Sequence, residues 1–178
     1  MQIQPARQSH SQTPMNELQQ TLIGDSAATP ARLILQAVAD HLAHHRVPSA
    51  PHSIYEEVWH LAYWQDMTLD WAAGRETPVP EHASIGFPTP DHVAQEKWDQ
   101  LRERFLIGTE TASALAGDEE VLPRSIRCPS LPGKPTRTMS VREQLESLAA
   151  HNAYHLGRVV LLRQLNGAWP PPSGSFTW

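Results

Sequence analysis

The last third of the chain carries an amphipathic helical pattern from Ser140 to Asn166. Ser140 and Glu143 have the spacing of a capping box, in which each side chain binds a free backbone N–H of the first turn, and Asn166-Gly167 is a typical helix end. One stripe of this helix predicts a buried face. Its apolar positions are Val141, Leu148, Val159 and Leu162.

A second capping box, formed by Ser53 and Glu56, predicts a helix from Ser53 to about Ala73, closed by Gly74. Between Val58 and Leu69 this segment is apolar on nearly all sides, as in a well-buried helix.

Proline after a capping residue predicts two further helix starts. The first helix would run from Thr29-Pro30 to about residue 45, and the second from Thr89-Pro90 to Gly117, with one continuous apolar face. A short helix over Met15–Ile23 precedes them.

Proline-rich stretches separate these helices. Residues 75–89 predict a crossing loop without regular structure, and residues 118–139 predict a long connection that admits a small hairpin. We therefore expect an all-α fold, a four-helix bundle with long inter-helix connections.

Composition narrows the class of protein. A length of 178 residues suits a single domain, which we place at 15–178 after a disordered tail at 1–14. A net charge of -5 argues against nucleic acid and anionic membranes as partners. The single cysteine, Cys128, and the lack of a signal or membrane-spanning segment lead us to expect a cytoplasmic protein.

Three histidines are the candidate metal ligands. His151 and His155 lie four residues apart, about 40° apart around the helix axis, so both imidazoles can reach one point. His60 lies within the other buried helix. Together they would leave coordination positions open, as catalytic sites require. The alternative is a set of neutral core histidines with local hydrogen-bond partners.

His41 and His45 form another pair with the same spacing. They stand at the predicted end of a helix, where histidines interact favourably with the helix dipole and free carbonyls, and we favour that explanation over metal ligation.

The motifs SIYEEVWHLAYW (53–64), HNAYHLGR (151–158) and GAWPPP (167–172) resemble the DinB family of metalloenzymes, in register over about 30–172. The resemblance implies a four-helix bundle in which His60, His151 and His155 hold a divalent metal, usually zinc or nickel. It also implies frequent homodimers and, for members with known activity, chemistry on low-molecular-weight thiols.

Two positions depart from the family pattern, which more often has Asp at Asn152 and Gln at Arg158. Asn152 is expected to affect a hydrogen bond beyond the metal ligands. Arg158 would either hold a substrate carboxylate or pair with Glu56 or Glu57.

These features lead to three functional hypotheses. The leading one is a metal-dependent enzyme that acts on a small-molecule substrate by thiol-dependent S-transferase-like chemistry, with Glu57 and Arg158 as candidate catalytic residues. The second is a metal-dependent hydrolase in which Glu57 serves as the base. The third is a non-catalytic bundle that binds metal or dimerises.

Overall fold

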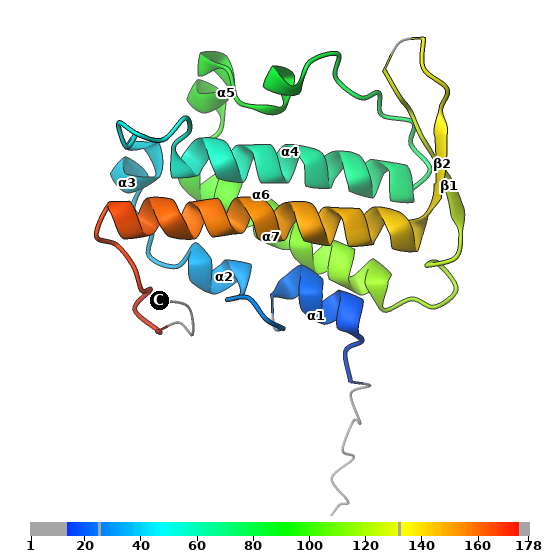
Figure 1. The fold of residues 1–178 in the computed structure, drawn as a ribbon, viewed down its shortest axis with the longest axis horizontal. Helices are drawn as coiled ribbons and strands as arrows, with labels where there is room; N and C mark the ends of the chain where they lie inside the picture. Colours follow the sequence, from blue (N-terminus) through cyan, green and yellow to red (C-terminus); the bar gives the residue numbers. More distant parts are fainter. Residues whose placement is uncertain (1–13, 25, 132, 175–178) are drawn as a thin grey trace, which may run out of the picture.

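Two long antiparallel helices, α4 (Ile54–Ala72) and α7 (Val141–Leu165), lie side by side at the centre of the fold (Figure 1). The structure, a computed structural model, describes residues 14–24, 26–131 and 133–174, so all but one residue of the predicted tail lies outside it. α6 (Trp98–Ala116) packs against α4. α1 (Glu17–Ile23) packs against both α6 and α7, and α2 (Ala31–Ile34) packs against α7. The predicted all-α bundle is confirmed. None of the described helices combines the length and apolar character needed to cross a membrane.

Both predicted capping boxes are present at the starts of α4 and α7. The Ser53 hydroxyl accepts from the Glu56 backbone N–H at 3.3 Å, and the Glu56 carboxylate accepts from the Ser53 N–H at 2.8 Å. Ser140 and Glu143 make the same pair of contacts, at 3.2 and 2.7 Å. These caps set where the two histidine-bearing helices begin.

The single helix predicted after Thr29 is wrong. The segment forms α2 and a separate α3 (Asp40–His44), and Ala37 between them has a φ of 53°. Two carbonyls of this segment accept bonds from distant side chains: Arg163 Nη1 donates to Ile34 O at 2.5 Å, and Trp98 Nε1 donates to Val38 O at 2.7 Å. These tertiary contacts replace hydrogen bonds that a continuous helix would make.

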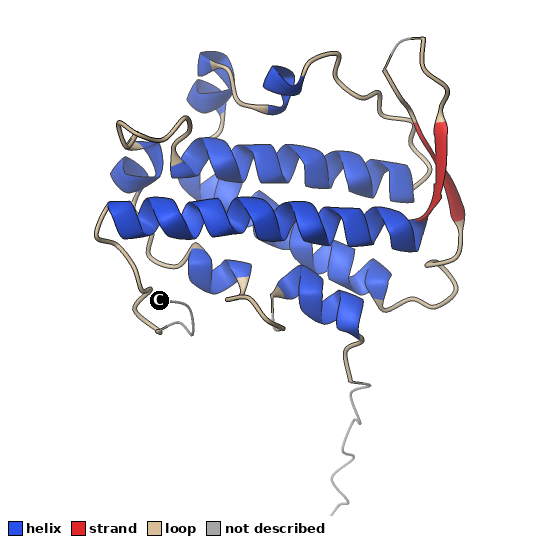
Figure 2. Cartoon of the chain, viewed as in Figure 1, coloured by secondary structure: helices blue, strands red, loops and turns tan. Residues whose placement is uncertain are grey.

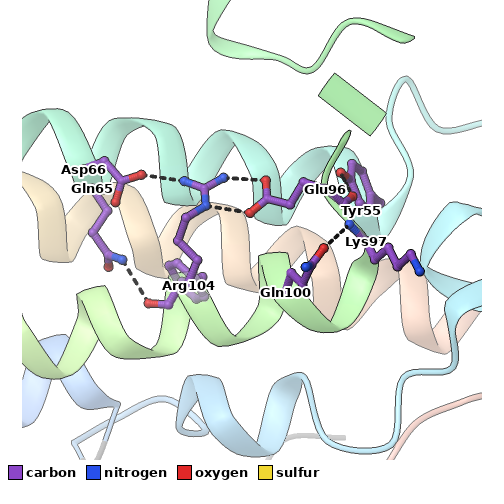
Figure 3. A network of polar contacts seen from close by, with 8 residues as sticks. Tyr55, Gln65, Asp66, Glu96, Lys97, Gln100 and Arg104 are labelled. Carbon is purple, nitrogen blue, oxygen red and sulfur yellow. Dashed lines mark hydrogen bonds and ion pairs between the residues drawn. The ribbon is translucent and has the colours of Figure 1, made fainter. Parts of the chain in front are cut away.

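The continuous helix predicted over 89–117 is also wrong, because it breaks between α5 (Pro90–Gln95) and α6. Glu96 is extended at the break, and its carbonyl accepts from the Tyr55 hydroxyl at 2.7 Å. Arg104 donates to the carboxylates of Glu96, at 2.7 Å, and Asp66, at 2.5 Å (Figure 3). This network attaches the break to α4.

The crossing segment runs from the end of α4 back over that helix to the start of α5 (Figure 1). It was predicted to be irregular throughout, but it contains a short 3-10 helix, η1 (Ala83–Gly86). The crossing lets α4 and α6 run in the same direction.

The hairpin admitted by residues 118–139 is present as antiparallel strands β1 (Ser125–Cys128) and β2 (Arg137–Ser140). Figure 2 shows it at the end of the bundle where α4 ends and α7 begins. Ser125 pairs with Ser140, so β2 leads directly into the cap of α7.

Substitution of a helical glycine tests how closely α4 and α6 approach each other, and a second helical glycine serves as the comparison. A Cβ on Gly108 would lie 2.1 Å from Gln65 Nε2, and Gln65 is fully buried and donates to Phe105 O at 2.9 Å. Gly108→Ala should therefore destabilise the protein by about 1–3 kcal/mol. Gly157→Ala, where a Cβ meets nothing within 4 Å, should stabilise it by roughly 0.5–1 kcal/mol.

Denaturant unfolding of both variants measures the difference. A Gly108→Ala protein as stable as the wild type would show that α4 and α6 do not approach as closely as described.

Candidate metal centre

The contact between α4 and α7 brings the three predicted histidines together. His60 comes from α4, His151 and His155 come from α7, and one ring nitrogen of each lies within 4.8 Å of the other two. The Nε2 atoms of His60 and His151 are 3.1 Å apart. The expected cluster of three imidazoles is therefore present.

In His60 and His155, a hydrogen bond on the side of the ring away from the cluster determines which ring nitrogen carries the proton. His60 Nδ1 donates to the Gly86 carbonyl at 2.8 Å, and His155 Nδ1 donates to Glu57 Oε2 at 2.7 Å. Because these oxygens only accept, each Nδ1 carries the proton, which leaves Nε2 as the nitrogen that can offer a lone pair; the Nε2 of His60 faces that of His151. Both lone pairs belong to atoms that a metal ion can bind.

Burial keeps two of the three rings neutral. Desolvation lowers the pKa of His60 and of His151 to about 4, and neighbouring histidines add to the effect. Neutral imidazoles bind zinc at about 2.0–2.1 Å, which places neighbouring ligand nitrogens of a tetrahedral site about 3.3 Å apart. The 3.1 Å between His60 and His151 is close to that separation, and the ligand nitrogens of all three residues lie within 4.8 Å of one another, so this donor set suits a divalent ion.

The carboxylate of Glu57 is completely buried beside His155. Arg158 Nη2 lies 2.7 Å from Glu57 Oε1 as an ion pair, although the atoms do not meet hydrogen-bond geometry. Of the partners expected for Arg158, Glu57 is thus the one found, while Glu56 contacts Arg46. A catalytic role for either residue stays a prediction.

The crossing segment contributes residues that the sequence did not indicate. Phe87 stacks on His60 with ring centroids 4.3 Å apart, and His52 stacks on the Phe87 ring at 3.9 Å. A Cβ on Gly86 would lie 2.9 Å from Trp64 Nε1, so only glycine allows this close approach. No spacing in residues 75–89 signals these contacts.

The other residues singled out in the sequence either lie away from the three-histidine cluster or make no side-chain hydrogen bond among the described residues. Within the described chain, His41 and His45 are exposed at the end of α3 and join no metal-binding group. Asn152 is 3% exposed, and neither polar atom of its amide reaches hydrogen-bond geometry, so the expected hydrogen bond is not formed. Its amide nevertheless slightly opposes the lowering of the His151 pKa.

The sequence pattern of the DinB superfamily matches residues 28–159. This range includes α4, the crossing segment and the part of α7 that carries His151 and His155. A comparison with curated proteins finds no match. The family match covers most of the chain and contains all three clustered histidines, and the chain therefore belongs to the DinB superfamily.

Proposed function

We propose that the protein is a divalent-metal-dependent enzyme that uses a low-molecular-weight thiol as cosubstrate. The observation that supports this most is the arrangement of His60, His151 and His155, whose rings face one another while Gly86 and Glu57 accept hydrogen bonds from two of them on the far side. Zinc and nickel are among the ions that suit three imidazoles with positions left open.

The chain's own residues would orient the ligands and hold protons away from them. Gly86 O and the Glu57 carboxylate keep the protons of His60 and His155 on Nδ1. Arg158 balances the buried Glu57 charge. A divalent ion held there supplies positive charge that lowers the pKa of a bound thiol or water.

Thiol transfer then requires one substitution. The thiol gives its proton to solvent, its sulfur forms a new bond to an electrophilic carbon, and the leaving group departs with the bonding electron pair. A thiolate brings its own negative charge to the site, which favours its binding over that of a neutral nucleophile.

The contacts of Glu57 favour this reaction over hydrolysis. The hydrolase hypothesis needs the Glu57 carboxylate free to take a proton from water, whereas its two oxygens face His155 and Arg158. We therefore assign Glu57 and Arg158 to positioning of His155.

The protein should bind about one divalent metal per chain, as a single three-ligand site demands. His151→Ala and His155→Ala should abolish stoichiometric binding in elemental analysis of protein purified without a His-tag. His41→Ala and His45→Ala, which change exposed histidines, should retain it. Equal metal loss in the two pairs of variants would contradict the assignment.

Glu57→Gln should lower metal affinity roughly 10–100-fold, because it removes the charged acceptor behind His155. Competition with a chromophoric chelator measures the affinity. Glu56→Gln is the matched control, since Glu56 is the neighbouring carboxylate but binds Ser53 and Arg46 instead. If both variants bind metal like the wild type, Glu57 does not position a ligand.

Metal-loaded protein should consume an electrophile such as monobromobimane in the presence of one member of a panel of small thiols. The catalysed rate should persist below about pH 8.5, the pKa of a free thiol, and removal of the metal should abolish it. Turnover of 4-nitrophenyl acetate without any thiol activity would instead favour the hydrolase.

A further inference from the structure

A cleft of about 440 Å³ opens beside the three-histidine cluster. His151, the most exposed ring of the cluster, lines it, as does Trp64, whose ring meets His60 and His151 edge-on at 6.2 and 6.5 Å. Small-molecule sites have volumes of about 300–1,000 Å³, so the cleft is large enough for an organic substrate.

The walls of the cleft are mainly apolar. Trp64, Trp71 and Leu148 contribute apolar surface from α4 and α7, and Leu131 adds to it from the hairpin connection. Uncharged polar groups are the hydroxyls of Thr68, Ser130 and Ser147 and the amide of Gln144, which already contacts Cys128 and Thr68. Such walls fit a ligand with an apolar or aromatic body.

The charge of the cleft is opposite to that of the chain. The net charge of the protein is -5, yet no aspartate or glutamate lines this cleft, whereas Lys134 and Arg137 both do. Neither cation has a carboxylate within ion-pair distance in the described structure. The guanidinium of Arg137 contacts Met139 Sδ at 2.9 Å, which leaves its charge uncompensated.

The register of the hairpin places Arg137 opposite Cys128, and both residues line the cleft. Burial raises the pKa of the Cys128 thiol, and the positive charge of Arg137 opposes that rise. Arg137 is thus close enough to act electrostatically on a group that lines the cleft. An uncompensated cation in such a place favours an anionic ligand.

We propose that this cleft binds a substrate of the metal site, and that this substrate is a small organic anion with an apolar or aromatic body, held by Arg137 and Lys134. The proposal rests on the proposed function, because it takes the three histidines as the reacting end of the cleft. The anionic group belongs to either the thiol or the electrophile.

Calorimetric titration with a matched pair of probes, 1-naphthaleneacetate and 1-naphthaleneacetamide, tests the charge preference on metal-loaded, full-length protein at low salt. The anion should bind at least about tenfold more tightly than the amide, as one charge-assisted contact supplies. Arg137→Gln combined with Lys134→Gln should remove this preference and leave the affinity for the amide unchanged.

Arg127→Gln is the control, because Arg127 lies on the same hairpin, pairs with Glu76 at 3.2 Å and does not line the cleft. It should retain the preference for the anion. Equal affinities for the two probes, or an equal loss in the Arg127→Gln variant, would overturn the proposal.

Metal content separates this proposal from the proposed function. The contacts to the anion come from the hairpin, so the same titration on metal-free protein should still show tighter binding of the anion, and the double variant should remove that difference. If the protein binds no metal but still prefers the anionic probe, the proposed metal-dependent reaction is refuted and the proposed class of ligand stands. One metal per chain without anion preference would refute the ligand class alone.

Cobalt-substituted protein identifies which substrate carries the anion, through the charge-transfer absorption of a cobalt-bound thiolate. If the thiol carries it, 4-(mercaptomethyl)benzoate should give the band at about tenfold lower concentration than benzyl mercaptan, and the double variant should remove the difference. If the electrophile carries it, the two thiols should act alike, with 1-naphthaleneacetate bound beside them. Thiols that act alike and no binding of 1-naphthaleneacetate would overturn the proposal.

Discussion

The buried carboxylate of Glu57 determines how α4 and α7 lie against each other. A carboxylate with no exposed surface is strongly unfavourable unless charged or hydrogen-bonding groups surround it, and here both partners, His155 and Arg158, come from the other helix. Sliding either helix by one residue would separate these groups. The same register places His60 beside His151, so the site depends on an interaction directly behind one of its own histidines.

The crossing segment supplies contacts to His60 that α4 and α7 do not. Its long path over α4 allows the Gly86 carbonyl to reach His60, and it places Phe87 between His60 and His52. A short loop would have led the chain straight into an antiparallel neighbour and left His60 Nδ1 without an acceptor. The connection therefore contributes to the site as much as to the topology.

The sequence predicts the parts of this structure that depend on local interactions. Capping boxes at Ser53 and Ser140 indicate where the histidine-bearing helices begin, and the spacing of His151 and His155 indicates a shared face. The helix breaks before α3 and α6 are not predictable in this way. They depend on distant side chains, such as Trp98 and Tyr55, that donate hydrogen bonds to backbone carbonyls. The spacing of apolar residues along the chain does not indicate such partners.

The position of Arg158 bears on how the protein would recognise an anion. Beside the histidines this arginine is a natural candidate to hold a substrate carboxylate, but its charge is already paired with the buried Glu57. Releasing it would leave that carboxylate without its counter-charge, which is strongly unfavourable in a buried site. The uncompensated cations along the neighbouring cleft are Arg137 and Lys134 of the described hairpin and its connection. Two charged residues of α4 and α7, Glu57 and Arg158, therefore orient His155. The cations that could contact an anionic ligand in the cleft are those of the hairpin and its connection.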